Sequence, residues 1–284
     1  MSRKLAASIR ARLKNHADAA REDFNLTLTR YGLERLLYRL SVSPHAGRFL
    51  LKGALLFSLW YDQPHRPTRD ADLLAFGSDE VDAMIDAFRE ICAVTCDEGL
   101  AFDPASVRGA EIRKSAGYGG VRIDVPALLD GARIALQVDV GFGDAVTPGP
   151  EAVRYPVLLD GLPAPALRAY PKAMVVAEKL HAICLLGLAN TRMKDYFDLD
   201  LLLRDEALDP AELRRAIEAT FERRKLDLPG NWPMGLSEAF AADPVKQAQW
   251  TAFLRKNRLE SVSLPELIGR LRAGLATLGA ATSA

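Results

Sequence analysis

The feature of this sequence that most constrains its fold is a change of hydrophobic period along the chain. Residues 106–113, 119–128 and 133–142 have the length and residue types of β-strands. Asp130-Gly131 lies between the last two segments, and this dipeptide is typical of a tight hairpin turn. The pattern predicts an α+β region that is followed by a mostly helical one, with domains at 1–165 and 166–284. The helices of the second region are expected at 171–187, 193–203, 210–225, 236–256 and 264–278.

The segments before residue 100 are predicted to add helices and one short strand to the first domain. Leucines at positions 33, 36, 37 and 40 recur at helical spacing. Residues 48–60 are apolar on all sides, which predicts a buried helix. A strand is expected at 70–76, and Ser78 is a suitable N-cap for a helix that reaches about residue 98.

The charges are balanced over the whole chain and uneven locally. The 37 Lys and Arg residues match 37 Asp and Glu residues, which excludes a uniformly basic coat for binding nucleic acid. Residues 1–52 nevertheless hold 11 basic and 4 acidic residues, whereas residues 62–103 hold 3 and 11. We expect the basic segment to form a solvated helix face, and a docking surface for a polyanion is the alternative.

The composition indicates neither a membrane protein nor a secreted one. No run approaches the roughly 18 apolar residues that a membrane helix needs, and the first residues lack the pattern of a signal peptide. The three cysteines, Cys92, Cys96 and Cys184, are too few for a disulfide framework. We therefore expect a cytoplasmic protein without a membrane partner.

Three aspartates form the first candidate site. Asp70 and Asp72 lie two residues apart on a predicted strand, so their carboxylates share one face. Two such charges repel unless a cation neutralises them, and Mg²⁺ prefers carboxylate oxygens. Asp139 lies in the apolar run 134–140, where an acid is costly unless it is paired, hydrogen-bonded or bound to a metal. Metal binding and capping by backbone amides at the strand end are both open for Asp139.

Two further segments are candidates for binding phosphate. The glycine in Lys52-Gly53-Ala54 allows backbone N–H groups to approach a phosphate, although a small residue is also typical of close helix packing. Arg192, Asp195 and Asp198 share one face of the predicted helix that follows Lys179. Ordinary salt bridges would explain this face, but its combination with Lys179 and the upstream acidic pair favours a functional site.

Together these segments resemble the AbiEii/AbiGii toxin family of nucleotidyltransferases, within the polymerase-β-like superfamily. The resemblance covers about residues 24–205 and rests on the order and chemistry of the segments 31–40, 51–55, 66–73, 138–144, 177–182 and 190–199. It implies a nucleotidyltransferase-like mixed sheet that is flanked by helices and followed by a helical domain. The family usually shows Gly-Gly or Gly-Ser where this chain has Gly53-Ala54, so a hydroxyl partner for the nucleotide is lost.

The resemblance also implies a reaction and a role for each candidate residue. The reaction would be the Mg²⁺-dependent transfer of a nucleotide from an NTP to a tRNA 3′ end or a protein hydroxyl. The chain would then be the toxin of a type IV-like toxin–antitoxin pair and would have a cognate antitoxin. The alternatives are a catalytically silent module of the same fold that binds a nucleotide or a protein, and a nucleotidyltransferase for small molecules. The implied metal ligands are Asp70, Asp72 and Asp139, which would act in catalysis with Lys179 and Asp195. The implied nucleotide-binding residues are Lys52, Gly53, Lys179, Arg192 and Lys194.

Overall fold

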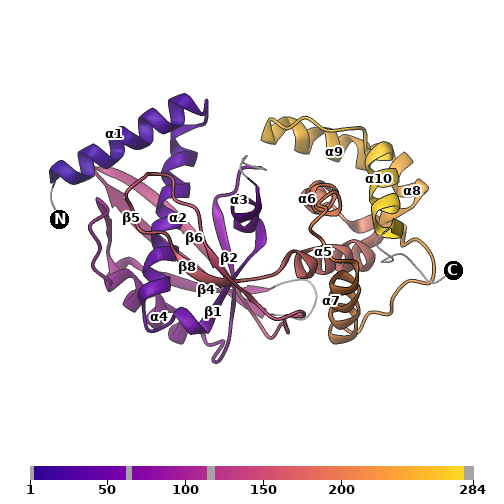
Figure 1. Cartoon of the computed structure of the whole chain (residues 1–284), viewed down its shortest axis with the longest axis horizontal. Coiled ribbons are helices and arrows are strands. Elements are labelled where there is room, and N and C mark those ends of the chain that lie inside the picture. Colours follow the sequence, from indigo (N-terminus) through magenta and orange to yellow (C-terminus); the bar gives the residue numbers. More distant parts are fainter. Residues whose placement is uncertain (1–2, 62–65, 114–118, 278–284) are drawn as a thin grey trace. The chain divides into compact units, whose positions relative to one another are not determined.

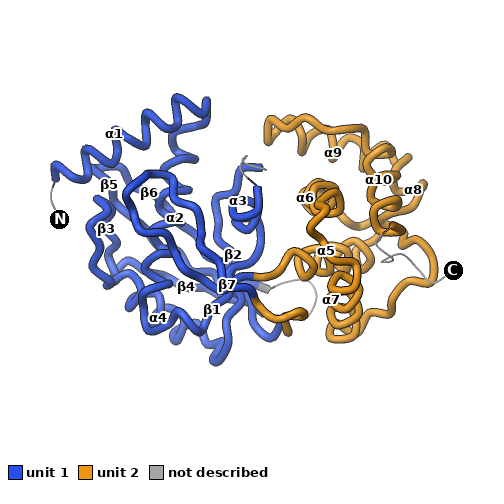
Figure 2. Tube along the Cα trace, viewed as in Figure 1, with its two compact units in different colours: residues 1–144, 151–169 blue, residues 145–150, 170–284 orange. Residues whose placement is uncertain are grey.

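The chain forms two compact units (Figure 2). The computed structural model describes residues 3–61, 66–113 and 119–277. The first unit comprises residues 1–144 and 151–169, and the second comprises residues 145–150 and 170–284. All strands of the described residues lie in the first unit, and the elements of the second unit are helices. The α+β class with a helical C-terminal region is therefore confirmed.

The first unit is built on a mixed sheet of eight strands, counted over the described residues. They are β1 (Phe49–Lys52), β2 (Asp70–Ala75), β3 (Leu100–Phe102), β4 (Arg108–Arg113), β5 (Gly119–Leu129), β6 (Ala132–Phe142), β7 (Glu151–Arg154) and β8 (Ala166–Ala169). Their order is β3-β5-β6-β2-β1-β8-β7, and β4 also pairs with β5. Strand β2 runs parallel to β6 and antiparallel to β1. Asp130 and Gly131 have φ values of +43° and +81°, as a tight hairpin turn requires, so the hairpin of β5 and β6 is confirmed.

The helices of the first unit differ in part from the prediction. They are α1 (Arg3–Ala19), α2 (Phe24–Val42), α3 (Leu56–Trp60) and α4 (Val81–Ala93). The helix expected over 48–60 is wrong in its first part, because residues 49–52 form β1 and pair with both β2 and β8. A short apolar run fits either element, so partners distant in sequence decided its conformation. Helix α4 also begins later and ends earlier than the predicted helix, which had Ser78 as its N-cap and reached about residue 98.

The two faces of the sheet differ in chemistry because side chains alternate along each strand. One face carries the buried side chains of Ala71, Ile123 and Val138 from three adjacent strands. Helix α2 lies along the sheet (Figure 1), and its Gly32 fits against the side chain of Leu136. Helix α4 packs against β4 and β5. The helices thus leave the polar face of the central strands to carry the candidate site.

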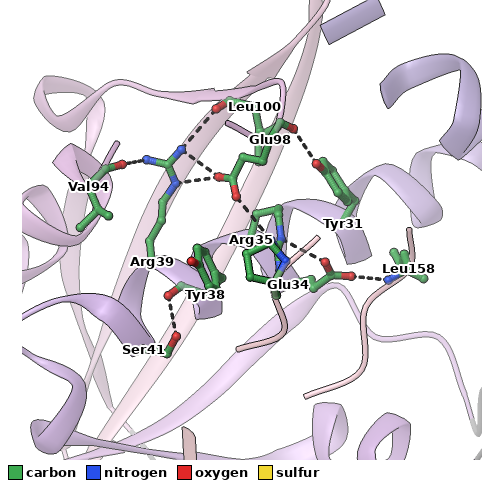
Figure 3. A network of polar contacts seen from close by, with 11 residues as sticks. Tyr31, Glu34, Arg35, Tyr38, Arg39, Ser41, Val94, Glu98, Leu100 and Leu158 are labelled. Atoms are coloured by element: carbon green, nitrogen blue, oxygen red, sulfur yellow. Dashed lines mark hydrogen bonds and ion pairs between the residues drawn. The ribbon is translucent and has the colours of Figure 1, made fainter. Parts of the chain in front are cut away.

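Helix α2 carries a buried network of charges (Figure 3). The side chains of Arg35 and Arg39 are buried, and Nη2 of Arg39 lies 2.8 Å from Oε1 of Glu98. Nε of Arg35 lies 3.0 Å from Oε1 of Glu34, whose other oxygen accepts a 2.7 Å hydrogen bond from the N–H of Leu158. Burial raises the pKa of Glu34 to about 7. The solvated face predicted for the basic segment is therefore wrong for Arg35 and Arg39, which pair with acids inside the fold. The exposed basic residues of α1 are Arg3, Lys4, Arg12 and Lys14.

The second unit agrees closely with the predicted helices. They are α5 (Lys172–Leu186), α6 (Met193–Leu203), α7 (Pro210–Arg223), α8 (Glu238–Ala242), α9 (Pro244–Asn257) and α10 (Leu264–Thr277). The single helix expected over 236–256 is wrong, because the chain breaks there into α8 and α9. Pro244 has no backbone N–H, and Asp243 caps the new helix by accepting hydrogen bonds from the N–H groups of Val245 and Lys246. Among the helices that the structure describes, none has the length and hydropathy to cross a membrane.

Candidate active site

Four charged residues form a row across the polar face of the sheet. Lys52 of β1 is opposite Asp72 of β2, and Asp72 is beside Asp139 of β6. Asp139 is in turn opposite Arg122 of β5. Neighbouring strands lie about 4.8 Å apart, so the row spans roughly 14 Å. The structure therefore brings Asp139 next to the predicted acidic pair and adds a cation at each end of the row.

Asp70 begins β2 on the same face, two residues before Asp72 and beside Gln137 of β6. Its Oδ1 accepts a 2.8 Å hydrogen bond from the hydroxyl of Thr68. Both aspartates are partly exposed, so their carboxylates can reach a ligand from solvent. Oxygen donors of this kind suit a hard divalent cation.

Gly53 brings the backbone after β1 against the carboxyl group of Asp72. Its φ of +72° lies in the left-handed region that favours glycine. A Cβ atom at this position would lie 2.7 Å from both Cβ and Cγ of Asp72, which is closer than such atoms approach. Glycine is therefore required both by the backbone conformation and by the space that Asp72 occupies.

The predicted nucleotide-binding residue Lys52 has its amine near the end of β6. The residue is buried, and its Nζ lies 3.5 Å from Oδ2 of Asp144. The amine also lies beside Gly141, where a Cβ would be 3.5 Å from Nζ in ordinary van der Waals contact. The Lys52 side chain thus reaches from β1 across β2 to the end of β6, where its amine faces Asp144.

Asp139 forms a two-pronged ion pair with Arg122. Nε of Arg122 lies 2.8 Å from Oδ1 of Asp139, and Nη2 lies 2.9 Å from Oδ2. The Asp139 side chain is 13% exposed and that of Arg122 is 40% exposed. The hydrogen bonds to Asp139 raise the pKa of the Arg122 guanidinium. The partner of Asp139 is therefore a side chain from the neighbouring strand, rather than the backbone amides considered from the sequence.

The oxygen atoms of the aspartates on this face indicate whether it can bind a metal ion. Asp70 and Asp72 supply suitable oxygens on one strand. Over residues 3–61, 66–113 and 119–277, no three His, Cys, Asp or Glu side chains are grouped so as to hold a metal ion. The first two carboxylates thus fit a metal, while both oxygens of Asp139 are engaged by Arg122.

A cavity of about 530 Å³ opens beside Asp70 within the first unit. Strand β6 begins five residues before the position that pairs with the first residue of β2. These residues of β6 and the first turns of α2 border the cavity. Arg69 and Arg133 line the cavity and are exposed, and neither has an ion-pair partner among the residues described. The other polar lining residues are Asn25, Thr29, Asp124 and Gln137.

The second unit holds a compact cluster around Lys179 of α5. Its Nζ lies 3.0 Å from Oδ1 of Asp195 and 2.6 Å from Oδ2 of Asp198, both on α6. Nε of Arg192 lies 2.7 Å from the other oxygen of Asp195. Both carboxylates are fully buried. The structure thus brings these four candidates together but leaves Lys194 exposed on the same helix.

Arg122 was not among the residues predicted for the site, although the sequence holds a signal for it. Arg122 is eight residues before Asp130, and Asp139 is eight residues after Gly131. Residues equidistant from a two-residue hairpin turn face each other across the strands. The pairing of Arg122 with Asp139 could therefore have been counted from the predicted turn.

Comparison with known proteins identifies the class of this chain as a nucleotidyltransferase. The family model described as "Nucleotidyl transferase AbiEii toxin, Type IV TA system" matches residues 35–266. The chain therefore belongs to the AbiEii family of nucleotidyltransferase toxins of type IV toxin–antitoxin systems, which confirms the resemblance found in the sequence.

Solved structures with a similar chain trace include two proteins of Helicobacter pylori. JHP933 is 13% identical, with a TM-score of 0.49 and coverage of 87% of this chain and 88% of that one. A proposed nucleotidyltransferase is 15% identical, with a TM-score of 0.49 and coverage of 87% and 91%. No curated protein matches the sequence.

Proposed function

We propose that this enzyme transfers a nucleotide from an NTP to an acceptor, with Mg²⁺ as its cofactor. The observation that carries the proposal is the pair Asp70 and Asp72 on one face of β2, with Asp72 against the backbone of Gly53. The two carboxylates would hold the metal, and the backbone at Gly53 would approach the triphosphate. When bound, a divalent metal stabilises the negative charge that develops on the phosphoryl oxygens.

The remaining candidates would bind phosphate or support the residues that do. The amine of Lys179 would neutralise phosphate oxygens, with Asp195 orienting it through their 3.0 Å contact. Arg192 and the exposed Lys194 would add positive charge at the start of α6. Lys52 would play the same part at the sheet, where its amine lies 3.5 Å from Oδ2 of Asp144.

The cavity beside Asp70 is the proposed site of the acceptor. Two exposed arginines, Arg69 and Arg133, line it and have no acidic partner within the described part of the chain. Phosphate groups attract such arginines, whereas a protein hydroxyl carries no charge. The two arginines support a tRNA 3′ end as the acceptor, and the acids Asp70 and Asp124 lie on the same lining. A cognate antitoxin is the second partner that we propose, because the family belongs to toxin–antitoxin systems.

One observation favours a different function, a catalytically silent module of the same fold. Arg122 already neutralises Asp139, the residue that the resemblance implies as a third metal ligand. A silent module would bind a nucleotide or a protein and would transfer nothing. The two functions differ in a direct assay of nucleotide transfer.

The assay combines the protein with each labelled NTP, Mg²⁺ and total tRNA, and follows the label into RNA. We expect transfer by the wild type and a loss of at least 10²-fold in Asp70→Asn, which keeps the size of the side chain but removes its charge. The control is Asp82→Asn, an exposed acid on α4 outside the site, which should behave like the wild type. Absence of transfer by the wild type to RNA or to added protein, or full activity of Asp70→Asn, would refute the proposed reaction.

A further inference from the structure

Arg122 holds both carboxylate oxygens of Asp139 in one planar fork. The contacts of 2.8 and 2.9 Å are those of a charge-assisted bidentate pair, which fixes the direction of both groups. The two residues are directly opposite on β5 and β6, so the pairing is built into the hairpin. Asp139 is also beside Asp72 in the parallel register, which places the fork next to the acidic pair of the proposed metal site.

The fork occupies the side of the Asp139 carboxylate on which a metal ion would chelate both oxygens. Each oxygen of Asp139 accepts a hydrogen bond from Arg122 there, so a cation that chelates Asp139 has to displace the guanidinium. An arginine side chain does not lose its charge at any ordinary pH, so deprotonation cannot release the aspartate. The Arg122 side chain is 40% exposed, and its guanidinium can therefore move into solvent when another cation takes its place.

We infer that Arg122 and a divalent cation are alternative partners of Asp139. In the wild type, Asp70 and Asp72 bind the metal, and Arg122 supplies the positive charge at the third carboxylate. When Arg122 is removed, Asp139 becomes available as an additional ligand. The inference rests on the proposed function only in its use of Asp70 and Asp72 as metal ligands.

The test measures the binding of Mn²⁺ alone, by the electron paramagnetic resonance signal of the free ion, without nucleotide or turnover. We expect Arg122→Gln to bind Mn²⁺ more tightly by clearly more than about tenfold, because loss of a unit charge about 6 Å from a divalent ion in water accounts for about tenfold and the released carboxylate of Asp139 adds a ligand. Arg154→Gln is the matched control, because it removes an exposed arginine from β7 at the other edge of the sheet, and it should bind as the wild type does.

A double-mutant cycle separates competition at Asp139 from a general change in charge. In the Asp139→Asn background, Arg122→Gln should raise the affinity by about tenfold at most, because the carboxylate it would release is gone and only the charge effect remains. An equal gain in both backgrounds would show a long-range charge effect only, and it would overturn the inference. The inference would also be overturned if Arg122→Gln unfolded like the wild type and bound Mn²⁺ with the same or a lower affinity.

The failure of the proposed function gives a different result in the same assay. If Asp70→Asn binds Mn²⁺ as the wild type does, the acidic pair holds no metal and the proposed function fails with it. If Asp70→Asn abolishes binding while Arg122→Gln changes nothing, the metal site stands and only the competition between Arg122 and the cation is wrong.

Discussion

The position of Gly53 permits a quantitative test of the site geometry. A Cβ at this residue meets two costs, a positive φ of +72° and an approach of 2.7 Å to Cβ and Cγ of Asp72. The left-handed conformation costs about 1–2 kcal/mol for a residue with a Cβ. Overpacking against a fixed neighbour costs about 1–3 kcal/mol more, so Gly53→Ala should lose about 2–5 kcal/mol of stability in the first unit.

Two alanine variants separate these costs in urea unfolding. Gly131→Ala meets only the positive φ of +81°, because no atom lies within 4 Å of its Cβ, and it should lose about 1–2 kcal/mol. Gly47→Ala meets neither cost and should lie within about 0.5 kcal/mol of the wild type. With a urea slope of about 2 kcal/mol/M, Gly53→Ala should unfold at a midpoint about 1–2.5 M lower than the wild type. Transfer activity should also fall, because the new methyl group displaces the Asp72 carboxylate. Equal midpoints for Gly53→Ala and Gly131→Ala, with full activity, would refute the close approach of Gly53 to Asp72.

Two further predictions concern buried charges. The pKa of Glu34 is raised from 4.5 to about 7, so the folded state keeps its proton in a range where the unfolded state has lost it. This group should therefore make the protein less stable as pH rises from about 4.5 to 7, by up to roughly 3 kcal/mol, and unfolding of Glu34→Gln should depend less on pH. Parallel pH curves for the two proteins would contradict this. Lys179→Met should cost the second unit about 3–5 kcal/mol in urea unfolding, because it removes a cation shared by the buried Asp195 and Asp198, whereas the exposed Lys194→Met should cost less than about 0.5 kcal/mol. Similar losses in these two lysine variants would contradict the cluster seen in the structure.

Elements with strong local signals could be predicted from the sequence. The dipeptide Asp130-Gly131 specifies a turn whose positive φ values are favourable for few other residues, and the strands on either side follow from it. Helix α6 has the predicted bounds, 193–203, because its apolar positions recur at helical spacing over three turns. The placement of Asp70 and Asp72 on one face follows from the alternation of any strand.

The tertiary structure decided the features that depend on partners distant in the chain. Residues 49–52 are a strand because β2 and β8 pair with them, although their apolar run also fits a helix. Arg39 is buried because Glu98, 59 residues later, lies within hydrogen-bond distance of its guanidinium. Propensity and periodicity describe interactions within a few residues, and they determined the hairpin, the helices of the second unit and the acidic strand. The closeness of Gly53 to Asp72, and of Arg39 to Glu98, is a property of packing, since it exists only after the sheet and helices have assembled.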